Sequence, residues 1–301
     1  MKKFIKKIFI YICILSSLFL VTLIYIYVIS GKPTTINDFL YHYQVDKIQS
    51  TKPLNTVFLG DSSLGNSINC DSFSVYTVIS CVNLALSGVY GYEGTYNMLK
   101  KTLKYHPEVK NIVLMHSIDM MTRSVSIKGY AYSMSSITDF NELNLKEKAK
   151  TVMAFLQIKD NIFSISNSIF LGKKIDSEVL HDGYIKQVAK VDFTDKEETF
   201  TISQIKNDKI KFLKKIVDLC KKQNINLIYL HGPIYNKTAE LSTGYLTEVN
   251  NKIKETGVTL VDTIISGTNN DFGDEPDHVI PEKKYFYTKI YADILNSLLI
   301  K

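Results

Sequence analysis

Two segments of the chain, more than 200 residues apart, carry residue types that could do chemistry together. Ser62 follows Gly60 and Asp61, directly after the apolar run 56–59. Glycine permits a tight turn at the end of a strand, and a following helix offers free N–H groups, so Ser62 has the setting of a nucleophile. Gly-Asp-Ser alone is weak evidence, because it should occur by chance in roughly one such chain in ten. Its position after an apolar run strengthens the prediction.

The second segment reads Asp274-Glu275-Pro276-Asp277-His278 and lies just before the last helical pattern. A histidine can accept a proton from a serine while a carboxylate a few residues upstream holds it in one tautomer. Taken alone, a single histidine among acidic residues is more often a solvated loop residue than a catalyst. Together with the serine, His278 predicts nucleophilic catalysis with the histidine as general base.

The patterning of apolar residues indicates the elements that must position these segments. Short apolar runs closed by Gly, Asn, Ser or Pro predict buried strands at 56–59, 78–86, 111–115, 225–230 and 258–261. Stretches with helical periodicity predict helices at 92–104, 143–158, 205–223, 243–255 and 283–299. Alternating strands and helices indicate an α/β, doubly wound fold with a mostly parallel sheet covered on both faces. Ligands bind beyond the carboxyl ends of such strands, where Ser62 is expected.

Residues 120–204 do not fit this alternation. The 85 residues exceed an ordinary crossover and contain one good helical pattern at 143–158 within a polar and aromatic remainder. One interpretation is a lid over the carboxyl edge of the sheet. The other is a peripheral subdomain that only thickens the fold.

The N-terminus predicts a membrane anchor. Residues 8–31 carry no charge, and a helix of that length reaches about 36 Å, enough for a hydrocarbon core of about 30 Å. A cleaved signal peptide usually has a shorter apolar region that ends in small residues, whereas this run stays β-branched and aromatic to its end. The four lysines before the run place the N-terminus in the cytoplasm. We therefore expect a cytoplasmic tail at 1–7, a single-pass anchor at 8–30, a linker at 31–54 and an extracytoplasmic domain at 55–301.

Charge and cysteine content exclude other classes of function. The net charge of +6 includes four lysines in the first seven residues, and the rest carries 32 basic against 30 acidic residues. Nucleic-acid binding needs a dense basic face, which this balance does not supply. No Cys-x-x-Cys spacing predicts a metal site, and no cofactor is expected. Cys70 and Cys81 either form a disulfide or stay as buried thiols.

The chain resembles the SGNH, or GDSL-like, hydrolases. The residues that carry the resemblance are Gly60-Asp61-Ser62, the segment 83–88 (Asn-Leu-Ala-Leu-Ser-Gly) after the second strand, and an acidic residue with His278 before the final helix. It covers residues 55 to 301, apart from the unmatched 120–204. The resemblance implies a flavodoxin-like three-layer α/β/α fold and ester or acyl-transfer chemistry. It further implies that Ser62 is the nucleophile, that His278 is the base, and that the N–H groups of Ser62 and Gly88 form an oxyanion hole.

Two positions depart from the family pattern. An asparagine of the family's third motif donates to the oxyanion hole, but here the segment 116–119 reads His-Ser-Ile-Asp and the asparagine position is Ile118. Losing one such donor costs about 3 to 4 kcal/mol of transition-state stabilisation, so either another donor replaces it, with His116 as the candidate, or the enzyme is slow. The family's acid lies three residues before the histidine, at Glu275. Asp274 lies one residue further away, and both stay candidates; Asp277 would point elsewhere in an extended segment.

Membrane-anchored branches of the superfamily that modify envelope polymers, such as teichoic-acid D-alanyl transfer proteins, also lack the third motif. This likeness implies a membrane-anchored serine acyltransferase or esterase. It would add or remove an acetyl or D-alanyl group on a cell-envelope glycan or lipid-linked polymer through an acyl-Ser62 intermediate. A membrane protein that donates the acyl group would be its partner. The alternative is a catalytically silent binding or assembly subunit of an envelope glycan pathway.

Overall fold

The computed structural model describes residues 2–30, 36–134, 137–156 and 198–300, without the side chains at 2, 19, 20, 22–30, 36, 38, 137, 138, 155 and 156. Its main feature is a five-stranded parallel sheet with the order β2-β1-β3-β4-β6. The strands are β1 (Thr56–Gly60), β2 (Cys81–Ala85), β3 (Asn111–His116), β4 (Asn226–His231) and β6 (Thr259–Leu260). All five predicted strands and their parallel arrangement are confirmed. A separate parallel pair joins β5 (Ile234–Tyr235) and β7 (Ser266–Gly267).

The five predicted helices are also present. They are α5 (Gly91–Tyr105), α8 (Leu145–Leu156), α10 (Ile210–Lys222), α12 (Thr243–Lys254) and α13 (Lys284–Leu295). In α10 the buried residues are Phe212, Leu213, Ile216, Val217 and Cys220. Their spacing places them on one stripe of the helix, which is the pattern that the sequence showed.

Several shorter elements were not predicted. The short helices are α3 (Ser62–Ser67), α4 (Cys70–Thr77), α6 (Ile127–Ser133), α7 (Ile137–Asn141) and α11 (Asn236–Leu241). The 3₁₀ turns are η1 (Gly88–Tyr90), η2 (Ile118–Thr122), η3 (Ile202–Gln204), η4 (Asn207–Lys209), η5 (Asn269–Asp271) and η6 (Pro281–Lys283).

The segment expected as a linker contains a packed helix, α2 (Ile36–Ser50). Its residues Leu40, Tyr41, Gln44 and Ile48 are buried at helical spacing. The Gln44 side chain donates to the carbonyl of Ala85 at 2.9 Å, at the end of β2. The folded domain therefore begins before residue 55, because one face of α2 is part of its core.

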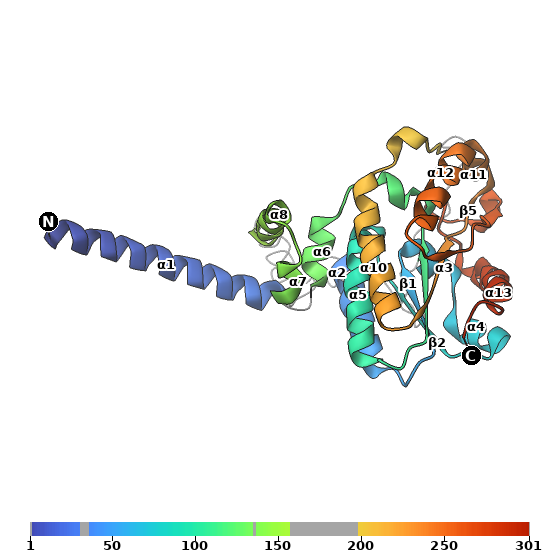
Figure 1. Cartoon of the computed structure of the whole chain (residues 1–301), viewed down its shortest axis with the longest axis horizontal. Coiled ribbons are helices and arrows are strands. Elements are labelled where there is room, and N and C mark those ends of the chain that lie inside the picture. Colours follow the sequence, from blue (N-terminus) through green and yellow to red (C-terminus); the bar gives the residue numbers. More distant parts are fainter. Residues whose placement is uncertain (1, 31–35, 135–136, 157–197, 301) are drawn as a thin grey trace.

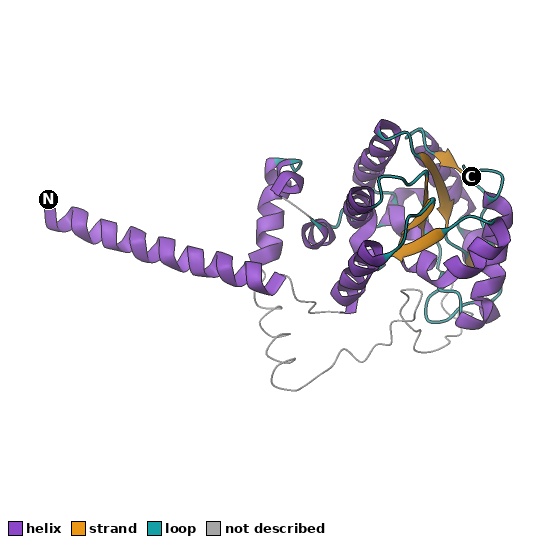
Figure 2. Ribbon diagram, turned by 90° about the horizontal axis from the view of Figure 1, so that it is seen from below, coloured by secondary structure: helices purple, strands orange, loops and turns teal. Residues whose placement is uncertain are grey.

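Helices cover both faces of the sheet. Successive side chains of a strand point to opposite faces, so neighbouring residues of one strand belong to different cores. Val57 and Leu59 of β1 join a core with residues of α2, α5, α10 and α12. Phe58 joins a second core with residues of α3, α4 and α13. Figure 1 shows α5 and α10 on one side of the strands and α4 and α13 on the other, and Figure 2 shows helices on both sides of the strands. The sheet is thus the middle of three layers.

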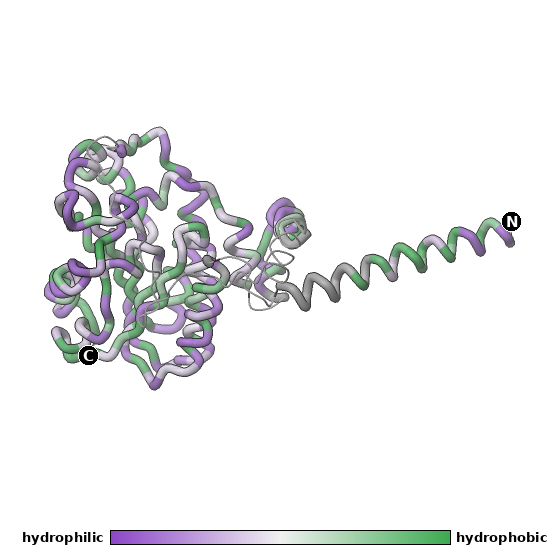
Figure 3. The backbone as a smooth tube through the Cα atoms, turned by 180° about the vertical axis from the view of Figure 1, so that it is seen from behind, coloured by the Kyte–Doolittle hydropathy of each residue, from purple (hydrophilic) through white to green (hydrophobic). Residues whose placement is uncertain are grey.

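Helix α1 (Lys2–Ser30) extends away from the sheet and its helices (Figure 1). The described apolar side chains of α1 are exposed, including Phe4, Phe9, Leu15 and Leu18. Figure 3 shows hydrophobic residues along the described part of α1 and hydrophilic ones at its N-terminal end. Among the residues that the structure describes, no helix is both long enough and apolar enough to span a membrane.

Part of the inserted region 120–204 packs on the main domain. The Asn97 side chain of α5 donates to the carbonyl of Tyr130 at 3.1 Å and to the hydroxyl of Ser133 at 2.8 Å. Lys100 of α5 pairs with the buried Asp139 of α7. Helices α6 and α7 are therefore anchored on α5. Residues 157–197, nearly half of the region expected as a lid, lie outside the described residues. All four cysteines, Cys70 and Cys81 among them, are free thiols.

Candidate active site

A cavity of about 220 Å³ lies where the chain leaves three neighbouring strands. Ser62 follows β1, residues 87–89 follow β2, and residues 117–119 follow β3. Another part of the wall is the loop 275–278, which precedes α13 and lies more than 200 residues after Ser62 in the sequence. Ser62 and His278 thus line the same cavity, at the edge of the sheet where ligands bind in doubly wound folds. Arg123, Glu198, Phe200 and Ile234 complete the lining.

Ser62 is the first residue of α3 and is partly exposed to the cavity. Asp61 caps this helix, because its Oδ1 accepts from the backbone N–H of Ser63 at 3.1 Å. The N–H of the first helical residue has no partner within its helix, so Ser62 brings both a hydroxyl and an N–H donor to the cavity. The neighbouring Ser63 is fully buried, with its hydroxyl donating to Asp61 at 2.7 Å. Of the two serines, only Ser62 therefore lines the cavity.

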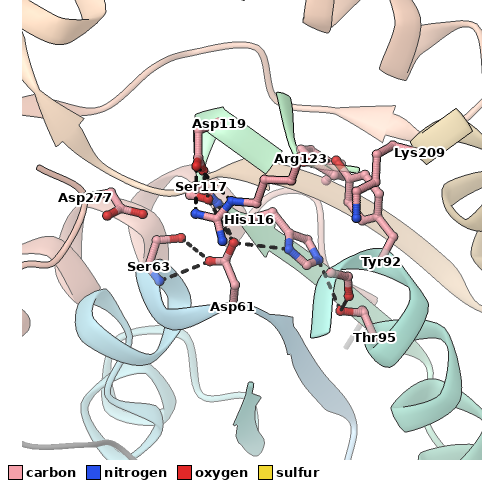
Figure 4. A network of polar contacts seen from close by, with 12 residues as sticks. Asp61, Ser63, Tyr92, Thr95, His116, Ser117, Asp119, Arg123, Lys209 and Asp277 are labelled. Atoms are coloured by element: carbon pink, nitrogen blue, oxygen red, sulfur yellow. Dashed lines mark hydrogen bonds and ion pairs between the residues drawn. The ribbon is translucent and has the colours of Figure 1, made fainter. Parts of the chain in front are cut away.

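Asp61 ties the ends of β1 and β3 together (Figure 4). Its Oδ1 accepts the two bonds from Ser63, and its Oδ2 accepts from the backbone N–H of Ser117 at 2.9 Å and the Ser117 hydroxyl at 3.0 Å. Burial alone would raise the pKa of Asp61, but these donors and the adjoining His116 outweigh burial and hold the pKa well below its usual range. Asp61 is thus a buried carboxylate whose oxygens are both hydrogen-bonded.

Gly60 is required by the approach of two strands. A Cβ at this position would lie 1.7 Å from the backbone oxygen of Met115 on β3. Backbone cannot retreat from such a contact, so no larger residue fits. In the Gly-Asp-Ser segment, the glycine thus allows β1 and β3 to pack closely, and the aspartate bonds the ends of these two strands to each other. Together they determine the position of Ser62.

The acidic partner of His278 is Asp274. His278 Nδ1 lies 2.8 Å from Asp274 Oδ1, and a carboxylate acceptor there requires Nδ1 to carry the proton. Glu275 contributes only its backbone carbonyl, which accepts from the N–H of His278 at 3.1 Å. Of the two acids that the sequence left open, the structure favours Asp274. Burial alone would lower the pKa of His278, but the negative charges of Asp277 and Asp274 raise it to about 9.

Asp277 does not point away from the site, as an extended segment would require. It lines the cavity, with Oδ1 3.9 Å from His278 Nε2. The segment turns here, because the N–H of His278 bonds the carbonyl three residues earlier, so alternation of side chains does not apply. The pKa of Asp277 is raised to about 7, mainly by burial and also by the carboxylates of Asp119 and Asp61, while the positive charge of His278 opposes the rise. No hydrogen bond joins Ser62 and His278 among the described residues, and such bonds are often long in unliganded enzymes.

The structure supports two of the three expected oxyanion donors. Ser62 and Gly88 line the cavity, whereas His116 does not. His116 is fully buried, with Nδ1 3.4 Å from Asp61 Oδ2 and Nε2 3.3 Å from the hydroxyl of Thr95. The ring of Tyr92 meets it edge-on, at a centroid distance of 4.7 Å. His116 therefore lies behind Asp61 and supports that carboxylate, and it is too enclosed to meet a ligand in the cavity (Figure 4).

Sequence reasoning missed an ion pair in the cavity wall, between Arg123 and Asp119. Arg123 Nε donates to Asp119 Oδ2 at 2.8 Å, and Nη2 lies 2.7 Å from the same oxygen. The Ser117 hydroxyl lies within hydrogen-bonding distance of both Asp119 and Asp61, which joins the pair to the serine-bearing turn. A signal was present, because Asp119 and Arg123 are four residues apart just after the third predicted strand, a spacing that allows a side-chain pair.

Two further polar side chains near the carboxyl ends of the strands have structural roles. His231 is buried, its Nε2 is 2.7 Å from Asn250 Oδ1, and burial lowers its pKa to about 4. Tyr92 is buried against Tyr229, with their hydroxyls 2.7 Å apart, so it is not available to stack on a sugar ring.

The described residues contain no group of His, Cys, Asp and Glu side chains that could hold a metal ion. The chain matches no protein-family model and no curated protein. The case for function therefore rests on the geometry of the cavity.

Proposed function

We propose that this chain is a serine acyltransferase or esterase of the SGNH type, with a flavodoxin-like fold, in which Ser62 forms an acyl-enzyme. The observation that carries the proposal is one cavity lined by a serine at a helix N-terminus and a histidine whose Nδ1 is held by a carboxylate. The strand order β2-β1-β3-β4-β6 agrees with it, because doubly wound sheets of this order bind ligands at the switch between β1 and β3.

In the first step, Ser62 Oγ bonds to the carbonyl carbon of the acyl donor while its proton passes to His278 Nε2. The carbonyl oxygen takes up the electron pair of the opened double bond and faces the N–H groups of Ser62 and Gly88. The tetrahedral intermediate then collapses, and the leaving oxygen takes the proton from His278. In the second half, water or an acceptor hydroxyl gives its proton to His278 Nε2 while its oxygen bonds to the acyl carbon. The bond from that carbon to Ser62 Oγ then breaks, and Oγ takes the proton back from His278, which regenerates Ser62 and releases the free acid or the acylated acceptor.

The cavity favours a small acyl group. Its volume of about 220 Å³ lies below the range of about 300 to 1,000 Å³ that is usual for pockets that enclose larger ligands. An acetyl or D-alanyl group fits such a space, and the acceptor would approach from outside. We infer that the acceptor is a cell-envelope glycan or a lipid-linked polymer, with a membrane protein as the source of the acyl group.

The location is part of the same proposal. The projecting helix α1 with exposed apolar side chains, and the charge-free run at 8–31 behind four lysines, favour a single-pass anchor with the domain outside the cytoplasm. We expect the full chain to stay with membranes after alkaline carbonate washing and a chain of residues 32–301 to be released. Release of the full chain would contradict the anchor and leave the proposed chemistry intact.

Turnover of p-nitrophenyl acetate by the purified full chain tests the chemistry. We expect wild type to release p-nitrophenol and both Ser62→Ala and His278→Ala to lose that activity. Ser63→Ala is the matched control for the serine, because its hydroxyl is buried against Asp61. Equal turnover by wild type and Ser62→Ala would contradict the proposal. Envelope acylation that persists in cells carrying Ser62→Ala, but not in cells without the chain, would favour the silent assembly subunit.

A further inference from the structure

The oxyanion hole of the proposed reaction lacks one side-chain donor, since Ile118 stands where the SGNH pattern has an asparagine. The carbonyl of Ile118 is also occupied, because it accepts from the Tyr245 hydroxyl at 2.7 Å. His116, the first candidate replacement, is enclosed behind Asp61. A replacement has to be a donor in the cavity wall next to Gly88.

Arg123 is in that place. A Cβ added to Gly88 would lie 2.2 Å from Arg123 Nη1, which places Nη1 within about 3.7 Å of the Gly88 Cα. The guanidinium therefore rests directly on the glycine whose N–H is an expected oxyanion donor. This contact also accounts for glycine at position 88, because any side chain would occupy the space of the guanidinium.

The guanidinium is oriented before any ligand binds. Nε and Nη2 are both directed at Asp119 Oδ2, at 2.8 and 2.7 Å, and the structure gives Nη1 no acceptor within the described residues. The other charged side chains that line the cavity are the carboxylates of Asp119, Glu198, Glu275 and Asp277, together with His278. Arg123 is thus the one permanent positive charge among the lining residues.

We propose that Arg123 Nη1 donates to the oxyanion together with the N–H groups of Ser62 and Gly88, in place of the missing asparagine. This inference rests on the proposed function. When Ser62 Oγ bonds to the carbonyl carbon, the oxygen gains a full negative charge, and a fixed cation beside it stabilises that charge more than it stabilises the neutral ester. Asp119 is a positioning residue, because it acts only by holding the guanidinium.

The rate at which a fluorophosphonate labels Ser62 tests the proposal. Ser62 Oγ displaces fluoride from phosphorus, and the phosphoryl oxygen takes the place of the oxyanion. We expect Arg123→Met to slow the maximal labelling rate by roughly 100-fold to 1,000-fold while the probe concentration for half-maximal rate changes little. Gly88→Ala should slow labelling as well. In the Arg123→Met background, Gly88→Ala should reduce the labelling rate by a much smaller factor than it does in wild type. Lys128→Met is the control for loss of a cation that is exposed and does not line the cavity, and it should label at the wild-type rate.

Chemical rescue separates this role from folding. Millimolar guanidinium chloride should restore much of the labelling of Arg123→Ala, and methylammonium chloride should not. Labelling of Arg123→Met at the wild-type rate, with Ser62 still the labelled residue, would overturn the role of Arg123 and leave the proposed function standing. A slow variant that guanidinium fails to rescue would also overturn it. No labelling of Ser62 in wild type would overturn the proposed function and this inference together.

Discussion

His278 donates from Nδ1 to Asp274 Oδ1 at 2.8 Å, across a turn of four residues in the loop before α13. The bond leaves Nε2 as the nitrogen without a proton in the neutral ring, which is the form a general base requires. The adjacent Glu275 also lines the cavity, but its side chain makes no hydrogen bond to His278.

Asp274→Asn should lower kcat for p-nitrophenyl acetate by roughly 100-fold to 10,000-fold. An amide can accept at Nδ1 only if its oxygen faces the ring, and it no longer stabilises the imidazolium that forms during acyl transfer. Glu275→Gln is the matched control and should retain activity within about threefold, because that side chain does not hold the histidine. The reverse ranking of the two variants would assign the acid to Glu275.

The pH dependence of kcat/KM should show an ascending limb with its midpoint near pH 9. The pKa of His278 is raised to about 9, and only the neutral ring accepts the serine proton, so activity increases as pH rises through this value. Asp277→Asn removes a negative charge that raises this pKa and should shift the midpoint to lower pH. A profile that is flat between pH 6 and 10, or unchanged by Asp277→Asn, would contradict these expectations.

Asp61→Asn should destabilise the fold by about 3 kcal/mol at pH 7. The amide NH₂ would face one of the N–H donors that now bind the carboxylate, and a buried donor would lose its acceptor. The pKa of Asp61 is lowered in the folded state, so its stabilisation is present above the unfolded value of about 3.9 and is lost as pH falls below it. Urea unfolding should therefore show a difference between wild type and Asp61→Asn that shrinks below about pH 4. A difference that is constant down to pH 2 would contradict the assignment.

Gly60→Ala should destabilise the protein by more than about 3 kcal/mol or prevent it from folding, because its Cβ would overlap the backbone oxygen of Met115. Gly244→Ala is the control. Gly244 lies in the first turn of α12, and an added Cβ would meet nothing within 4 Å, so alanine there should be neutral or stabilising by up to about 1 kcal/mol. Thermal unfolding of the two variants provides the comparison.

The sequence predicted the sheet well because four of its five strands, β1 to β4, are almost entirely buried on both faces. Residues 111–116 are all fully enclosed, and a continuous apolar run is the expected signature of such a strand. The same reasoning missed α2, because only one face of that helix is buried and Gln44, at its centre, is polar. Nε2 of Gln44 donates to the carbonyl of Ala85, a contact between parts of the chain that are 41 residues apart.

Within the site, Ser62 and His278 were predicted from their positions next to the ends of elements, and Gly88 from the resemblance to the SGNH hydrolases; all three line the cavity. It could not decide between Asp274 and Glu275, since the turn of the loop determines which carboxylate meets the imidazole. It assigned His116 to the oxyanion hole because the residue ends a strand. In the structure the ring points into the core, where its two nitrogens face Asp61 and Thr95.

The most direct test of the account is to locate the acyl group on the protein. The full chain would be mixed with p-nitrophenyl acetate, quenched in acid within a fraction of a second, digested, and analysed by mass spectrometry. The account predicts a 42-dalton acetyl adduct, the mass that an acetyl group adds in place of a proton, on the peptide that contains Ser62. It should be present in wild type and Ser63→Ala and absent in Ser62→Ala. An adduct on another residue, or one that persists in Ser62→Ala, would contradict the claim that Ser62 is the nucleophile.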